Sequence, residues 1–162
     1  MVKKSVQDAL NPQLNAELYS SYLYLSMSAY CETIPLKGFA KWLRVQAREE
    51  LEHGMKFYDY LVETGGTVNL TKIDAPKTRW NSPREVFEEV YAHEQKVTAL
   101  INGLVDLANK EKDPATKQFL DWFVKEQVEE EANASDILAQ IKMSGDEVEN
   151  LTSLDNQLGK RE

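Results

Sequence analysis

Carboxylate side chains interrupt the apolar stripe of each of four long helical segments in this 162-residue sequence. The densest interruption is REELEH, residues 48–53, in which Glu50 and His53 lie three residues apart and therefore share one face of a helix. The other three stripes each carry one acid near their middle, namely Glu17, Glu94 and Glu130. Because such stripes normally face the core, we expect these groups to point into one interior.

The inward polar residues recur at a fixed distance along the chain. A shift of 77 residues carries one set onto the other, from Glu17, Glu50 and His53 to Glu94, Gln127 and Glu130. The same shift aligns REELEH with KEQVEE, residues 125–130. Each half of the chain is therefore predicted to form one helical hairpin with equivalent inward groups. Two such hairpins related by a two-fold axis would bring these groups together inside a bundle.

Several carboxylates buried together are costly unless their charge is compensated. Lysine or arginine could compensate it, but the stripes contain neither, and protonation with raised pKa values is a second route. A pair of bound cations is the route we favour. Oxygen ligands with one imidazole suit iron or manganese, with zinc as a competitor, and are too oxygen-rich for a typical structural zinc site. A histidine such as His53, taken alone, is more often a packing or surface residue.

The helical segments that carry these residues are bounded by capping residues and prolines. The first segment runs to about Glu32 and begins near residue 5, or at Asn11 if Asn11-Pro12 is an N-cap followed by a first-turn proline. The second begins near Lys37 and stops at Gly65-Gly66, a typical helix end.

The later segments begin in a similar way. Ser82, Pro83 and Glu85 form a predicted capping box at the start of the third segment. The fourth runs from Asp113-Pro114 to about Ser144-Gly145. A short amphipathic segment over about residues 146–159 follows, with apolar residues at helical spacing: Val148, Leu151, Leu154 and Leu158.

Connection lengths predict how these helices are arranged. Short turns join segments one to two and three to four, so each pair is expected to be antiparallel. Residues 65–82 connect the two pairs, and at ~3.3 Å per residue they can reach along a helix of about 40 Å. We therefore predict an all-α fold in a single domain, residues 1–162. Its four-helix bundle spans about residues 5–144, with one long crossover between helices two and three and a short fifth helix.

The composition excludes several classes of function. A formal net charge of −8 argues against a nucleic-acid partner, which would favour a basic face. Cys31 is the only cysteine, so a cysteine-rich metal cluster is excluded. No segment resembles a signal peptide or a membrane span, so we expect the cytoplasm and no membrane partner.

Four stretches of the sequence resemble the non-haem ferritins of prokaryotes, and the resemblance extends over essentially the whole chain. They are NAELYSSYLYLSM (15–27), REELEHGMKFYDYL (48–61), YAHEQKVT (91–98) and FLDWFVKEQVEEEA (119–132). Related families fit less well. Bacterioferritin-like chains carry a second histidine where this sequence has Glu130, rubrerythrin-like chains add a cysteine-rich domain, and Dps-like shells build their site between subunits.

The resemblance implies a ferritin-like bundle and a role for each inward residue. One iron would be held by Glu17, Glu50 and His53, and the other by Glu50, Glu94 and Glu130. Gln127 would lie beside them, and Tyr24 would be close enough to donate an electron. A third iron would bind to Glu49, Glu126 and Glu129, with Glu130. Because Glu49, Glu126 and Glu129 lie off the central stripe, a solvated acidic face is the alternative for these three.

The activity implied by the resemblance is that of a ferroxidase and iron store. Ferrous iron would be oxidised by dioxygen or peroxide and deposited as ferric mineral inside a hollow shell of about 24 subunits. Two alternatives remain: a di-iron oxidase or peroxidase without storage, and a non-catalytic helical oligomer.

Several other residues carry simpler expectations. Tyr24 and Trp122 are expected in the core, and His93 on the surface. Met27, Met55 and Met143 are expected to be packing residues, so no haem is assigned. The stripe from Val148 to Leu158 could pack on its own bundle, although the resemblance implies a fifth helix that lines an axis of the shell.

Overall fold

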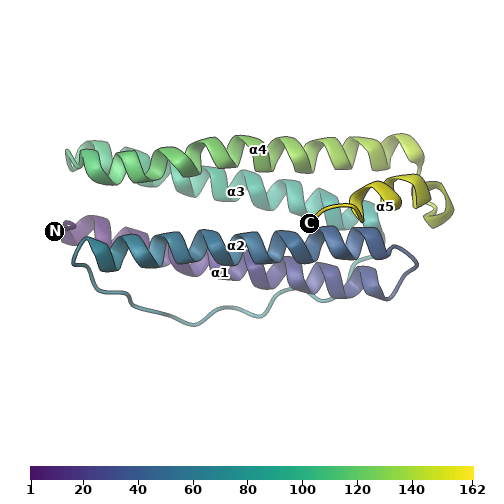
Figure 1. The fold of residues 1–162 in the computed structure, drawn as a ribbon, viewed down its shortest axis with the longest axis horizontal. Helices are drawn as coiled ribbons and strands as arrows, with labels where there is room; N and C mark the ends of the chain where they lie inside the picture. Colours follow the sequence, from purple (N-terminus) through teal and green to yellow (C-terminus); the bar gives the residue numbers. More distant parts are fainter.

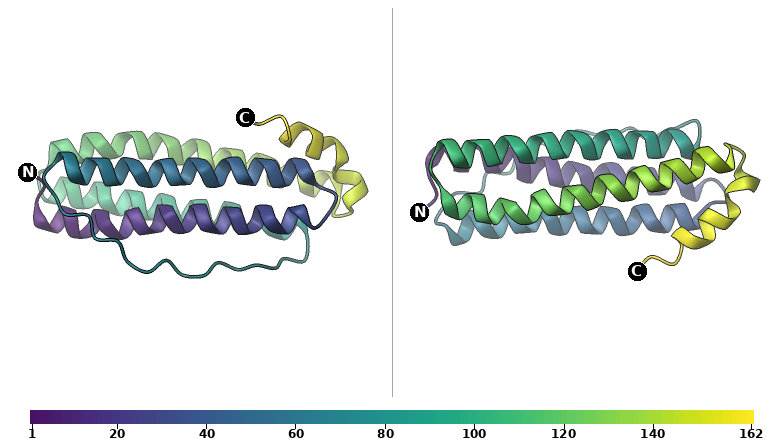
Figure 2. Two further views of the ribbon diagram at one scale, coloured as in Figure 1. Left: turned by 60° about the horizontal axis from the view of Figure 1, so that its bottom comes forward. Right: turned by 90° about the horizontal axis from the view of Figure 1, so that it is seen from above.

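A computed structural model describes residues 1–162 and contains helices but no strands (Figure 1). The elements are α1 (Lys4–Glu32), α2 (Lys37–Glu63), α3 (Pro83–Lys110), α4 (Pro114–Ser144), the 3-10 helix η1 (Val148–Leu151) and α5 (Thr152–Leu158). Helices α1 to α4 lie side by side as a bundle, and α5 lies across one end of it (Figures 1 and 2). The predicted all-α fold with a four-helix bundle and a short fifth helix is confirmed.

Local sequence signals set the starts of α3 and α4 as predicted. The Ser82 hydroxyl accepts a hydrogen bond from the Glu85 backbone N–H at 3.1 Å, and the Asp113 carboxylate accepts one from the Thr116 N–H at 3.0 Å. In both helices the residue after the cap is a proline, which lacks the N–H that the first turn would leave unpaired. These contacts satisfy backbone donors that have no partner within the helix.

Of the two starts predicted for α1, the one near residue 5 is confirmed and the one at Asn11 is wrong. The helix begins at Lys4 and continues through Pro12 without a break. Its first turns are held by tertiary packing, because Val6 and Leu10 are buried in the core. The Asn11 amide instead donates to the Thr67 carbonyl at 3.0 Å, and its oxygen accepts from the Asn69 N–H at 2.7 Å. Asn11 therefore fixes the crossover against α1.

The crossover between α2 and α3 is extended and has no helix of its own, as predicted. It runs along the outside of the bundle from one end to the other (Figure 2), so that α2 and α3 point in the same direction. Two side chains of α1 hold it at intervals: the Asn15 amide donates to Lys72 O at 3.1 Å, and the Ser26 hydroxyl donates to Lys77 O at 2.7 Å.

The apolar core is divided into two clusters. One lies toward the α1–α2 turn and includes Tyr24, Phe39 and Phe87, and the other lies toward the N-terminal end and includes Leu14, Phe57 and Phe123. Along every one of the four long helices, the buried acids fall between the members of the two clusters. The bundle thus contains a polar layer between two apolar halves.

The short C-terminal helix packs on its own bundle. Leu151, Leu154 and Leu158 are buried in the first cluster, and the Asp155 carboxylate accepts a hydrogen bond from the Phe39 N–H at 2.9 Å. Gly38 makes this approach possible, because a Cβ there would lie 1.8 Å from the Asp155 carbonyl oxygen. Of the two readings of this stripe, packing on its own bundle is the one observed within the single chain.

Three side chains that were expected to be packed inside are exposed instead. Trp122 is 39% exposed and Met143 is 85% exposed, and Met55 is exposed as well. They lie on the outward faces of α4 and α2. Residue type alone does not indicate which face of a helix a side chain occupies. Tyr24 and Met27 are fully buried, as expected.

Candidate metal centre

Each of the four long helices contributes one to three residues to the polar layer. Seven of its side chains are at most 5% exposed: Glu17, Gln46, Glu50, His53, Glu94, Gln127 and Glu130. They are buried because each occupies a position in the inward stripe of its helix. The structure thus brings together the six residues that the repeat related, and adds Gln46.

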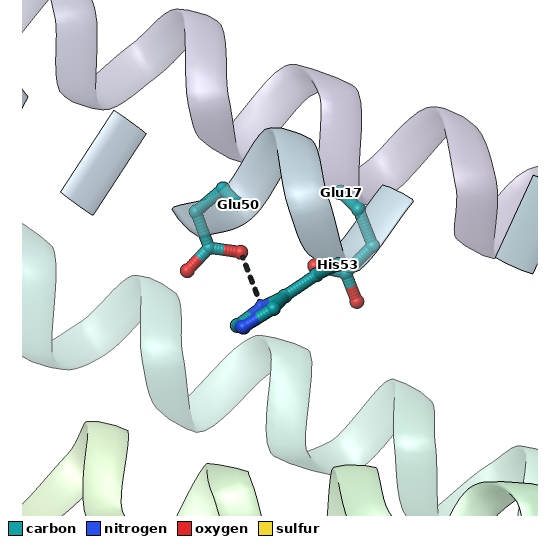
Figure 3. A group of neighbouring side chains, drawn as sticks. All are labelled: Glu17, Glu50 and His53. Atoms are coloured by element: carbon teal, nitrogen blue, oxygen red, sulfur yellow. Dashed lines mark hydrogen bonds and ion pairs between the residues drawn. The ribbon is translucent and has the colours of Figure 1, made fainter. Parts of the chain in front are cut away.

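Helices α1 and α2 contribute the first group of this layer. Glu17 extends from α1 toward Glu50 and His53, which lie one turn apart on α2 (Figure 3). The His53 Nδ1 atom is 3.2 Å from Glu50 Oε2, and its Nε2 atom is 3.8 Å from Glu126 Oε1. The two ring nitrogens of His53 therefore face different carboxylates, Nδ1 that of Glu50 and Nε2 that of Glu126.

Helices α3 and α4 contribute the second group. The Gln127 amide of α4 donates to Glu94 Oε2 at 3.1 Å and to Thr98 Oγ1 at 3.2 Å, and the Tyr24 hydroxyl donates to Glu94 Oε1. Both oxygens of Glu94 are thus oriented by neutral donors. Such donors hold a carboxylate in place without adding charge.

Gln46 connects the two groups. Its amide nitrogen donates to Glu130 Oε2 at 2.6 Å and to Glu50 Oε1 at 3.2 Å. On the other side of the layer, the Gln13 amide donates to Glu17 Oε1 at 2.9 Å. Two glutamines, from α2 and α1, therefore fix three of the acids.

Crowding and burial disfavour ionisation of these acids. Burial raises the pKa of Glu17 well above its usual range, and the charge of Glu50 raises it further. Burial also raises the pKa of Glu50 well above its usual range, assisted by Glu94 and Glu130. The pKa of Glu130 rises from 4.5 to about 8 through burial first and the charge of Glu94 second. Without a cation, the layer therefore takes up protons.

The ligand atoms are close enough to hold cations in three overlapping groups. Within each group the candidate atoms lie within 4.8 Å of one another: Glu17, Glu50 and His53; Glu50, Glu94 and Glu130; and His53, Glu126 and Glu130. The first two are the triads expected for two irons, and they share Glu50. The layer fits two hard cations, because four carboxylates can balance four positive charges and the donors are mainly oxygen.

The residues expected around a third iron are not assembled as a group. Glu126 faces His53 and Glu130, whereas Glu129 is exposed. Glu49 is instead paired with Arg161, whose Nη2 atom lies 2.6 Å from Glu49 Oε2.

Two features of the centre were missed or misjudged from sequence. Gln46 was not among the predicted site residues. It lies in the inward stripe of α2, one turn before Glu50, and this position could have identified it. His93, expected on the surface, is partly buried, and a ring nitrogen is 2.7 Å from the Ser20 hydroxyl. Burial lowers the pKa of His93 to about 4, so the ring is neutral beside Tyr24.

The layer is not an open pocket. A surface cavity of about 740 Å³ lies elsewhere and is lined by Glu32, Lys41, Arg44, Val45, Arg48 and Glu162. None of the helices is both long and apolar enough to cross a membrane.

A four-helix bundle with a long crossover and a closed layer of paired acids is the architecture of di-iron carboxylate proteins. The chain belongs to the ferritin family: the model of the ferritin-like domain matches residues 7–144.

Similar proteins extend this assignment over the full length. A bacterial non-haem ferritin of Bacteroides fragilis (strain 638R) is 47% identical over 99% of this chain and 100% of its own. One from Staphylococcus saprophyticus is 43% identical over 99% and 96%, respectively. The crystal structure of an open-pore ferritin from the archaeon Archaeoglobus fulgidus, 48% identical, covers 100% of this chain and 99% of its own, with a TM-score of 0.98.

Proposed function

We propose that this chain is a ferritin subunit that oxidises ferrous iron in the polar layer and stores the product as ferric mineral. The observation that carries this proposal is the pair of buried triads that share Glu50. The full-length similarity to non-haem ferritins supports iron as the substrate. We place this activity in the cytoplasm, where ferrous iron is available.

Glu17 and His53 hold one ferrous ion, Glu94 and Glu130 hold the other, and Glu50 bridges them. Two ferrous ions each lose one electron, and dioxygen takes up both electrons with two protons to give hydrogen peroxide. With peroxide as the oxidant, the same two electrons and two protons give two molecules of water. The anionic oxygen ligands stabilise the ferric product, because hard donors favour the more highly charged ion.

The two metal positions are unequal. The position of Glu17 has the imidazole of His53, whereas the position of Glu94 has oxygen donors only. Imidazole suits ferrous iron, so we propose that the first position holds Fe²⁺ more firmly. The second position binds ferrous iron less firmly and suits the ferric ion, and we propose that it passes iron onward.

Gln127 and Tyr24 orient Glu94 at this second position. Because both donate hydrogen bonds to Glu94, they keep its oxygens directed into the layer. Gln127 is also placed to hold water or dioxygen beside the metals. Tyr24 is buried and its hydroxyl donates to Glu94, so it is placed to supply one electron in place of a ferrous ion; it would then lose its phenolic proton and be left as a tyrosyl radical.

We propose that ferric iron then moves outward past Glu126, toward the separate acids Glu129 and Glu49, and enters the cavity of a shell. The similar ferritin structures support assembly into a shell, and we propose about 24 subunits.

Aerobic loading tests the whole proposal and separates it from the alternatives. Purified protein is given several hundred ferrous ions per shell, and its mass and electron density are followed. A ferritin gives oxidation with a dense core inside a shell. Oxidation without a core indicates an oxidase that does not store iron, and no oxidation indicates a non-catalytic oligomer.

A further inference from the structure

The chain after α5 turns back along α2 and reaches the polar layer. Arg161 lies there with its side chain only 20% exposed. Its guanidinium stacks on the Trp42 ring, 4.4 Å from the centroid. Its nitrogens donate to three acceptors: Trp42 O at 3.3 Å, Gln46 Oε1 at 2.9 Å and Glu49 Oε2 at 2.6 Å. Figure 1 shows this end of the chain beside α2.

The contact with Gln46 links Arg161 to the acids. A guanidinium has donors and no acceptor, so the Gln46 amide must turn its oxygen toward Arg161. Its nitrogen is then directed at Glu130 and Glu50, at 2.6 Å and 3.2 Å. Arg161 therefore determines, through one amide, how two carboxylates of the layer are held.

The contact with Glu49 places a positive charge where a cation could otherwise bind. At 2.6 Å the guanidinium occupies a carboxylate oxygen directly. A charge-assisted pair of this kind, partly screened from water, is stronger than an exposed ion pair. A metal ion can bind that oxygen only if Arg161 moves away.

Arg161 is not needed to dock α5. The helix is held by the buried Leu154 and Leu158 and by the bond from the Phe39 N–H to Asp155. Beyond α5 the backbone N–H groups of Lys160 and Arg161 donate to Gln157 O at 3.2 Å and to Leu158 O at 3.3 Å, so this short tail can loosen while α5 stays docked. The side chain of Arg161 can therefore leave Glu49 while α5 stays in place.

We propose that Arg161 is a positioning residue that competes with cations for Glu49 and, through Gln46, couples that competition to Glu50 and Glu130. This inference rests on the proposed function. When iron leaves the layer toward Glu49, it displaces Arg161 and frees the Gln46 amide. When the outer position is empty, Arg161 returns and restores the amide to the acids. A cation at Glu49 thereby changes the hydrogen bonds that Gln46 donates to Glu50 and Glu130.

Calorimetric titration of the assembled, metal-free protein with Zn²⁺ tests the competition without any redox step. The variants are Arg161→Ala, Arg161→Lys and the neighbouring exposed Lys160→Ala as a control. Losing the competitor should tighten the weakest class of Zn²⁺ sites by about tenfold in Arg161→Ala, the order expected for one charge-assisted bond. Arg161→Lys keeps the positive charge but loses the paired guanidinium donors, so its Zn²⁺ affinity should lie between those of the parent and Arg161→Ala. Lys160→Ala should bind Zn²⁺ as the parent does.

A double variant assigns the effect to Glu49. Adding Glu49→Gln to Arg161→Ala should abolish the tightened class, because the released carboxylate is gone. Hydrogen exchange of residues 152–162 provides a readout that a purely structural role would not change. In the parent protein, saturating Zn²⁺ should speed exchange of the backbone N–H groups of Lys160 and Arg161, and in Arg161→Ala it should not.

The proposal is overturned if Arg161→Ala binds Zn²⁺ in the weakest class as the parent does, or if Zn²⁺ leaves exchange in the tail unchanged. These outcomes are independent of the proposed function. A parent protein that fails to oxidise Fe²⁺ refutes the ferroxidase, whereas the Zn²⁺ titration still decides the role of Arg161.

Discussion

Glu50 is the residue on which the proposed chemistry depends most, because it belongs to both triads. Replacing Glu50 by Gln keeps its size and removes the shared anionic ligand. We expect Fe²⁺ oxidation to slow by at least about 100-fold, the upper range for loss of a group that supports a metal ligand. Glu52→Gln, an exposed acid on the same helix, is the matched control. Stopped-flow absorbance after mixing with Fe²⁺ in air measures both, and equal rates would show that the centre is misplaced.

Glu130 gives the metal-free protein a pH-dependent stability of definite sign. Its pKa is raised from 4.5 to about 8 in the folded state, so folding favours its protonated form. That stabilisation is complete below the unfolded pKa and is lost as pH rises through the folded value. Glu130→Gln stays neutral throughout. It should match the parent near pH 5 and exceed its stability by a few kcal/mol near pH 9, in the presence of chelator.

Thermal unfolding of parent and variant across that range measures the effect. Glu129→Gln, an exposed neighbour on α4, is the control and should show no such divergence. A stability difference between Glu130→Gln and the parent that stays constant with pH would mean that Glu130 is ionised throughout in the folded protein.

For individual residues, the positions of the buried acids could be predicted from the sequence, whereas most of their hydrogen-bond partners could not. Glu17, Glu50, Glu94 and Glu130 could be located because each replaces an apolar residue in a helical stripe. Arg161 could not, since no periodicity connects it to α2 and its position depends on how the chain folds back. Whether Glu49 binds a metal or pairs with Arg161 likewise depends on tertiary contacts that the sequence does not reveal.

Among the elements, the crossover depends most on α1. Asn11 donates to Thr67 and accepts from Asn69, and it is largely buried. Asn11→Ala should remove both hydrogen bonds and lower the free energy of unfolding by about 1–3 kcal/mol. Denaturant unfolding measures it, with the exposed Gln118→Ala as control. No difference between the two variants would show that the crossover is held by other contacts.

The helices themselves were predictable where the signal is local. Ser82-Pro83 and Asp113-Pro114 begin α3 and α4 because a cap and a proline act within one turn. The same kind of signal at Asn11-Pro12 failed. There, burial of Val6 and Leu10 extends the helix back past the proline, and the polar side chain is used by the crossover instead. A local motif therefore predicts a helix start only where no tertiary contact competes for it.

For the whole molecule, we expect a large closed homo-oligomer. The apolar stripe of the last segment does not supply the interface by itself, since Leu151, Leu154 and Leu158 are buried in their own chain. The similarity to ferritin structures supports the assembly. Sedimentation velocity should show one species of about 24 subunits, and only monomers or dimers at every salt concentration would contradict it.

The polar layer lies between two apolar clusters. Its proposed role in binding iron explains why the bundle keeps costly buried acids. The most direct test of this account is an anaerobic Fe²⁺ titration of the metal-free protein, followed by admission of oxygen. We expect two ferrous ions per chain, one bound more tightly than the other, and a rapid rise in ferric absorbance when oxygen enters. His53→Ala should remove the tighter class first, because it loses the only nitrogen donor. Absence of bound Fe²⁺, or two identical sites that fill together and remain occupied after many turnovers, would contradict the account.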